Sequence, residues 1–165
     1  MNLVESTNPK VVAVSHQGKW INYRESRDCD DSTTWIFTDG SSNGGFGAVA
    51  VRDGEHIKKA RGFETPGKTR NIAAELNGLL LALGLARQDE SITVVSDYLG
   101  VAAWMTNNWR IKEPDVRVKI NEAKKIVAAK NLKVDYCHHG GHQRDNSDFT
   151  KFNNIADELA GELTS

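Results

Sequence analysis

Four acidic residues could act together although they are far apart in the chain: Asp39, Glu75, Asp97 and Asp157. Asp39 and Asp97 each close an apolar run, whereas Glu75 and Asp157 lie among apolar residues at helical spacing. Carboxylates that converge without bases repel one another and tend to stay protonated, and divalent cations relieve this repulsion. Hard oxygen ligands select Mg²⁺ or Mn²⁺. The pattern therefore indicates a metal site.

Each acid also has an ordinary structural explanation. An aspartate before a glycine, as at Asp39, commonly forms a turn, and Asp157 could be a solvated helix residue. Glu75 lies three residues after Ile72 and four before Leu79, so it belongs to the helix stripe that faces the sheet. A carboxylate there needs a partner. The arrangement across two strands and two helices is more informative than any single acid.

The predicted elements would bring the acids together. Runs rich in β-branched and aromatic residues predict three antiparallel strands, TTWIFTD, GFGAVAV and EHIKKARGF, the last two joined by a turn at Asp53-Gly54. After them we expect a helix from Thr69, the strand SITVVSD, two helices, the strand LKVDYCHH and the helix NNIADELAGEL. This order predicts an α/β fold. If the first and fourth strands are parallel neighbours, Asp39 and Asp97 lie at the same sheet edge.

Composition limits the class of protein. The chain has 165 residues, 39% apolar and 26% charged, which is typical of one globular domain. We place the core domain at residues 33–165 and treat residues 1–32 as an N-terminal extension, a possible extra hairpin plus a polar linker. The net charge of −1 gives no global sign of a polyanionic partner. Two cysteines, without a signal-like or membrane-spanning run, predict a cytoplasmic protein with no membrane association.

Five short motifs follow one another along the chain: TDGS (38–41), AAEL (73–76), SD (96–97), HGGH (139–142) and NNIADELA (153–160). From about Trp35 to Leu163 the chain thereby resembles type 1 ribonuclease H. The resemblance implies a ribonuclease H-like fold: a five-stranded mixed sheet, with three antiparallel strands and then parallel crossovers, flanked by helices. It also implies that the four acids form a catalytic Asp-Glu-Asp-Asp set that binds two Mg²⁺ ions, with Mn²⁺ as a substitute.

The activity that the resemblance implies is endonucleolytic hydrolysis of the RNA strand of RNA·DNA hybrids, leaving 5′-phosphate and 3′-hydroxyl ends. His139 matches the catalytic loop histidine of the family, which assists proton transfer or product release. The resemblance implies substrate contacts by six residues: Gly40, Ser41, Asn43, Asn71, Trp104 and Asn153. The expected partner is a hybrid, and we expect a monomer.

Some residues depart from the family pattern or allow another interpretation. Ile72 replaces an asparagine that is frequent in the family, and Tyr98-Leu99 replaces a frequent Ser-Gln pair, so minor-groove recognition could differ. A zinc site is an alternative use of four neighbouring residues: Cys137, His138, His139 and His142. The alternative functions are cleavage of double-stranded RNA or of a DNA junction, and hybrid binding without catalysis.

Overall fold

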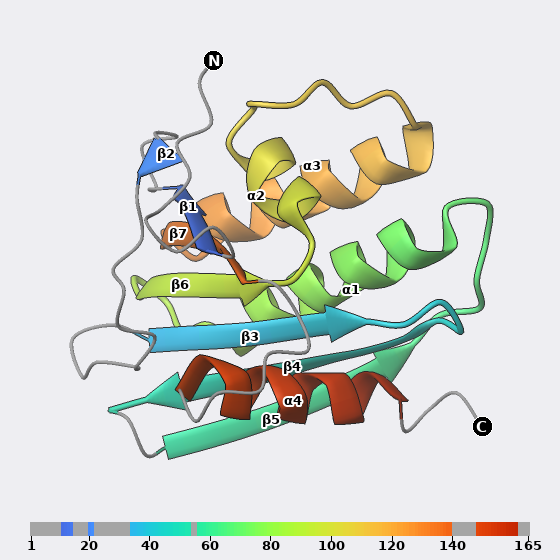
Figure 1. Cartoon of the computed structure of the whole chain (residues 1–165). Coiled ribbons are helices and arrows are strands. Elements are labelled where there is room, and N and C mark those ends of the chain that lie inside the picture. The colour runs from blue at the N-terminus through green and yellow to red at the C-terminus, as the bar shows by residue number, and fades with distance from the viewer. Residues whose placement is uncertain (1–10, 15–19, 22–33, 54–55, 140–147, 162–165) are drawn as a thin grey trace.

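The computed structural model describes residues 11–14, 20–21, 34–53, 56–139 and 148–161. Their strands form one seven-stranded sheet in the order β2-β1-β7-β6-β3-β4-β5 (Figure 1). The strands are β1 (Val11–Val14), β2 (Trp20–Ile21), β3 (Thr34–Gly40), β4 (Gly45–Arg52), β5 (His56–Phe63), β6 (Ser91–Ser96) and β7 (Lys133–His139). The helices are α1 (Arg70–Leu85), α2 (Leu99–Met105), α3 (Pro114–Ala129) and α4 (Asp148–Gly161).

The five-stranded mixed sheet that the resemblance implied is confirmed in β5-β4-β3-β6-β7. β3, β4 and β5 are antiparallel, whereas β6 is parallel to both β3 and β7. Thr38 of β3 pairs with Ser96 of β6, so the carboxyl ends of these two strands lie side by side. Asp39 and Asp97 each come one residue after this pair, and the expected meeting of the two strand ends is therefore found.

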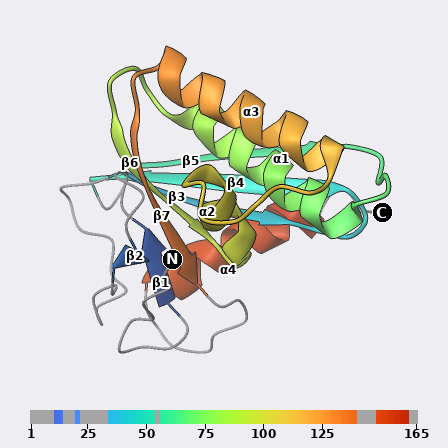
Figure 2. The same ribbon diagram turned by 90° about the horizontal axis from the view of Figure 1, so that it is seen from above.

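The helices cover the two faces of the sheet. Seen from above, α1 and α3 lie on one side and α4 lies on the other (Figure 2). The apolar stripe of α1 buries Leu76, Leu79 and Leu83 against Ile36 and its neighbours, as the helical spacing predicts. On the other face α4 packs Phe152 against Phe37, with 5.6 Å between ring centroids. Burial of apolar surface on both faces holds the sheet between two helical layers.

The first two strands extend the predicted sheet beyond β7. β1 runs antiparallel to β7, with pairs from Val11–His139 to Val14–Tyr136, and β2 pairs with β1. Both strands lie in the segment 1–32, and the rest of that segment lies outside the described residues. As a result β7 has a strand partner on each side. Among the described helices, none is long and apolar enough to cross a bilayer.

Candidate active site

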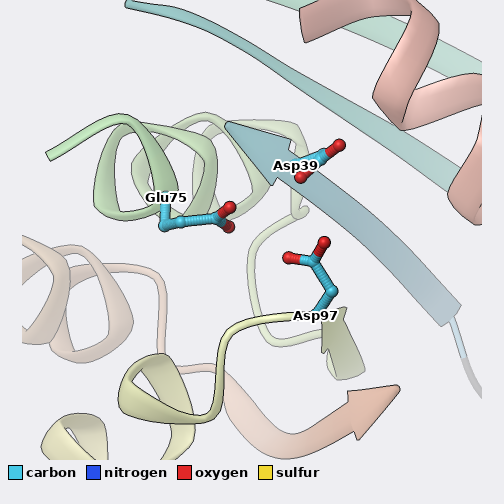
Figure 3. A group of neighbouring side chains, drawn as sticks. All are labelled: Asp39, Glu75 and Asp97. Carbon is cyan, nitrogen blue, oxygen red and sulfur yellow. The ribbon is translucent and has the colours of Figure 1, made fainter. Parts of the chain in front are cut away.

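Three of the four acids meet at the carboxyl end of the sheet. Asp39 comes from β3, Glu75 from α1 and Asp97 from the turn after β6, and their side chains point toward one another (Figure 3). One carboxylate oxygen of each lies within 4.8 Å of those of the other two. Asp39 and Glu75 are only 6% and 8% exposed. The group is therefore a compact acidic cluster that is largely removed from water.

A close approach of α1 to β3 brings Glu75 to Asp39. A Cβ atom at Gly40 would lie 2.4 Å from the backbone carbon of Ala74 and 2.6 Å from the backbone nitrogen of Glu75. Only a residue without a side chain fits between the strand end and the helix. Gly40 also donates its backbone N–H to Oδ1 of Asp39 over 2.9 Å. The glycine after Asp39 thus sets both the helix position and the carboxylate orientation.

We expect Gly40→Ala to destabilise the protein by about 1–3 kcal/mol, because the added methyl group must displace the α1 backbone. Gly84→Ala, in α1 itself, is the control. A Cβ at Gly84 meets nothing within 4 Å, and alanine is a better helix former than glycine by about 1 kcal/mol. Urea unfolding monitored by circular dichroism measures both. An unchanged midpoint for Gly40→Ala would show that the contact between strand and helix is not tight.

Burial and mutual repulsion raise the pKa values of the cluster. Burial is the main cause that raises the pKa of Asp39 to about 8, followed by a side-chain hydrogen bond with Asp157 and the charge of Asp97. Burial likewise raises the pKa of Glu75 well above its usual range, with further contributions from Asp97 and Asp39. None of the main causes is a basic side chain. Oε2 of Glu75 is buried without a hydrogen-bond partner among the described residues. Among the described residues, no positive charge therefore offsets the burial and mutual repulsion of Asp39 and Glu75.

At the opposite end of the sheet, the carboxylate of Glu90 has a basic partner, which allows a comparison with the acidic cluster. Glu90 binds Arg52 through two hydrogen bonds of 2.8 and 2.9 Å and accepts a third from Thr34 at 2.7 Å. Burial opposes the charge of Glu90, but these bonds outweigh it and lower its pKa to about 2. The contrast indicates that the missing cation at Asp39 and Glu75 has to come from outside the described chain.

Asp157, the fourth predicted acid, lies beside the cluster rather than within it. It is an exposed residue of α4 and forms a side-chain hydrogen bond with Asp39. Two carboxyl groups form such a bond only if one of them holds a proton. Asp157 is not among the three acids whose oxygens lie within 4.8 Å of one another. Asp157 therefore contacts Asp39 without being a member of the three-acid cluster.

All four predicted acids, Asp157 included, line a cleft of about 610 Å³. Three of the predicted substrate residues line this cleft, namely Gly40, Ser41 and Asn71. The wall also contains Ile72 and Tyr98, the two departures noted in the sequence, and Ser42, which the sequence did not single out. The cleft is therefore a polar hollow with an apolar and aromatic edge.

The other predicted contacts lie further away. Asn43 is exposed in the turn between β3 and β4. Trp104 is 9% exposed in the core and lines a neighbouring apolar hollow of about 460 Å³, together with Ile72 and Trp109. Asn153 is buried in α4, and its Oδ1 has no hydrogen-bond partner in the described part of the chain. Ile72 lines both hollows and thus connects the acidic cleft to the tryptophans.

Only the backbone of the predicted catalytic histidine, His139, belongs to the described part of the chain. β7 ends at His139, while the His139 side chain and residues 140–147, including His142, lie outside the described residues. Cys137 and His138 are successive in β7, so their side chains point to opposite faces of the sheet. Cys137 packs with Phe37 in the core under α4. The two residues cannot share one zinc ion there, which disfavours the zinc interpretation.

Fold and site together define a ribonuclease H-like α/β protein with an acidic cluster at the carboxyl end of its sheet. Residues 31–165 match the ribonuclease H family, and the chain belongs to this family of enzymes. No curated protein matches the chain.

Solved structures of ribonucleases H are similar to this chain. Ribonuclease H1 of the halophilic archaeon Halobacterium salinarum is 27% identical, with a TM-score of 0.60 over 79% of this chain and 96% of its own. An N-terminal ribonuclease H domain from Mycobacterium tuberculosis is 24% identical, with a TM-score of 0.61 over 81% and 99%. LC11 ribonuclease H1, solved in complex with an RNA/DNA hybrid, is 23% identical, with a TM-score of 0.54 over 77% and 93%. The latter two support the fold alone.

Proposed function

We propose that this enzyme is a metal-dependent endoribonuclease that hydrolyses the RNA strand of RNA·DNA hybrids and leaves 5′-phosphate and 3′-hydroxyl ends. The observation that carries the proposal is the acidic cluster, with Asp39, Glu75 and Asp97 oxygens within 4.8 Å and no basic side chain among the main causes of the raised pKa values of Asp39 and Glu75. Membership of the ribonuclease H family supports it. LC11 ribonuclease H1, which shares the fold, was solved in complex with an RNA/DNA hybrid.

The residues present fit divalent cations. Carboxylate oxygens are the ligands that Mg²⁺ and Mn²⁺ prefer, and Oε2 of Glu75 is a buried oxygen still without a partner in the described chain. We propose that Asp39, Glu75, Asp97 and Asp157 hold two Mg²⁺ ions, for which Mn²⁺ can substitute. When bound, such a pair activates a water and stabilises the leaving oxygen of a phosphodiester.

The chain itself supplies position and shape. Gly40 keeps the Asp39 carboxylate oriented through its N–H. Asp39 and Glu75 are buried, so little water reaches this part of the cluster. We propose that Ser41 and Asn71, which line the cleft, donate hydrogen bonds to the hybrid, with further contacts from Gly40, Asn43, Trp104 and Asn153. Selection for RNA requires a partner for the 2′-hydroxyl, the group that distinguishes RNA from DNA. His139 is proposed to transfer a proton near the attacked phosphate.

A comparison of three duplexes of one sequence tests this function: RNA·DNA, RNA·RNA and DNA·DNA, each with Mg²⁺. We expect internal cuts in the RNA strand of the hybrid alone, and products with 5′-phosphates that a phosphatase removes. Equal cleavage of the RNA duplex would point to double-stranded RNA as the substrate instead. Tight hybrid binding without cleavage would indicate that the protein binds hybrids but is not an enzyme that cleaves them.

The proposal extends to the organisation of the chain. Residues 33–165 are proposed to form the catalytic domain, and residues 1–32 an extension that adds β1 and β2 to its sheet. We further propose a cytoplasmic monomer. Residues 1–32 could cover the edge of β7 only, or could also bind the substrate, and their deletion separates these two roles. Hybrid affinity should stay the same in the first case and should fall in the second.

A further inference from the structure

Side chains hold both ends of the peptide unit that joins Asp97 to Tyr98. Its carbonyl, that of Asp97, accepts a hydrogen bond from Nε2 of His138 over 2.9 Å. Its N–H, that of Tyr98, donates to the hydroxyl oxygen of Ser96 over 3.1 Å. A peptide unit is planar, so fixing its two ends fixes its orientation. The backbone on the C-terminal side of Asp97 is therefore locked by Ser96 and His138.

The strand pairing explains why these two side chains reach the same peptide. Ser96 and His138 are paired residues of the parallel strands β6 and β7, and this is the last pair between them. Ser96 is also the last residue of β6. The peptide in question follows directly, where the backbone leaves the sheet. Because a carbonyl only accepts hydrogen bonds, the contact requires His138 to carry its proton on Nε2.

Asp97 needs such support more than the other acids of the cluster. Asp39 is itself a member of the ladder, paired with Gly47 of β4, and Glu75 lies within the hydrogen-bonded turns of α1. Asp97 lies beyond the last ladder pair and before α2, which begins at Leu99. Regular secondary structure does not hold the backbone of Asp97 on this side, whereas Ser96 and His138 hold the peptide that follows it.

We propose that His138 is a positioning residue: its hydrogen bond to the Asp97 carbonyl holds the Asp97 carboxylate where a divalent cation and the substrate phosphate are bound. This inference rests on the proposed function of the same site. His138 is not among the described residues that line the cleft or form the acidic cluster, and its hydrogen bond is to the backbone of Asp97, so we infer that it acts through Asp97. Partners that orient a metal ligand in this way typically contribute about 10–100-fold in affinity or activity.

Two substitutions of similar size separate the hydrogen bond from the packing. His138→Leu fills the space without a donor, whereas His138→Gln can place an amide N–H close to the position of Nε2. For the leucine variant we expect about a tenfold weaker affinity for Mg²⁺ in calorimetric titration without substrate, and a kcat lowered about 10–100-fold with little change in KM. The glutamine variant should recover most of both. Thermal unfolding of the metal-free variants checks that both are folded.

The tautomer of His138 gives a readout that does not depend on metal or substrate. A long-range ¹H–¹⁵N spectrum of the metal-free wild type should show the proton of His138 on Nε2. A proton on Nδ1 would overturn the proposal, and so would glutamine and leucine variants with equal Mg²⁺ affinity and equal kcat. If the wild type binds Mg²⁺ but cleaves no hybrid, the proposed function fails, while the Mg²⁺ titrations of the two variants still decide the role of His138.

Discussion

Replacement of Asp39 by asparagine is expected to lower hybrid cleavage at least about a hundredfold while making the metal-free protein more stable. The loss follows because an amide is a poor ligand for Mg²⁺ and leaves the cluster one charge short. The gain follows because burial and the neighbouring acids raise the pKa of Asp39 from 3.8 to about 8, so its charged form is costly in the folded state. We expect a gain on the order of 2 kcal/mol near neutral pH, equivalent to about 5 °C in melting temperature.

Asp53→Asn is the matched control for this substitution. Asp53 is an exposed aspartate in the turn after β4, with φ of 54°, a conformation that asparagine adopts as readily as aspartate. The same change in charge there should leave both cleavage and melting temperature close to the wild type. Scanning calorimetry with a chelator and an assay with Mg²⁺ measure the two properties. An Asp39→Asn variant that unfolds earlier than the wild type would contradict the electrostatic account of the cluster.

The second large effect expected is a stability that falls with pH unless Mg²⁺ is present. A carboxyl group with a raised pKa binds its proton more tightly in the folded state, so its contribution is fully present below the unfolded pKa. That contribution is lost as pH rises through the folded pKa, which for Asp39 is about 8. Between about pH 6.5 and about pH 8 the metal-free protein should lose on the order of 2 kcal/mol from this group.

The raised pKa of Glu75 adds to this decline, whereas carboxyl groups with basic partners do not oppose it. The pKa values of Glu90 and Glu64 are lowered, so their contributions are complete well below neutral pH. Mg²⁺ binds the ionised cluster, and the rise in melting temperature on adding it should therefore be larger at the higher pH. Thermal scans at the two pH values, with Mg²⁺ or with a chelator, test this. In Asp39→Asn both the decline and the effect of Mg²⁺ should shrink. A rise in melting temperature with pH in the metal-free wild type would be the opposite of the expected sign.

The meeting of Asp39, Glu75 and Asp97 was largely predictable because these acids occupy positions with strong local patterns. Asp39 and Asp97 follow short apolar runs rich in β-branched residues, which favour buried strands, and Glu75 interrupts an apolar stripe of period 3.6. The parallel pairing of β3 and β6 then brings the strand ends together, as the crossover rule indicates. These residues could be named from the sequence since their neighbours fix both their secondary structure and the direction of their side chains.

The features that escaped prediction depend on tertiary contacts. Nothing local in Val11–Val14 specifies β7 as its neighbour, because edge pairing is chosen by the sheet that is already formed. α4 begins at Asp148, five residues before the run NNIADELAGEL that predicted it, since the apolar stripe starts earlier with residues that a loop could equally contain. The bond from His138 to Asp97 depends on strand register, which the sequence does not display.

The cluster also shows a conflict between stability and function. Glu90 has its cation in Arg52, while Asp39 and Glu75 are buried with other acids and are stabilised in the neutral form. A fold selected for stability alone would replace such acids with apolar or amide groups. Their presence at the end of the sheet is explained if a metal supplies the missing charge, and this is the central claim of the proposed function.

The most direct test of that claim is cleavage of an RNA·DNA hybrid labelled at one end of each strand, with Mg²⁺ or with a chelator in its place. Asp97→Asn, assayed under the same conditions, reports whether the cluster is the site. We predict cuts in the RNA strand alone, only with Mg²⁺, and none above background for the variant. RNA cleavage that persists in the chelator, or in Asp97→Asn with Mg²⁺, would contradict the claim that this acidic cluster is a metal-dependent active site.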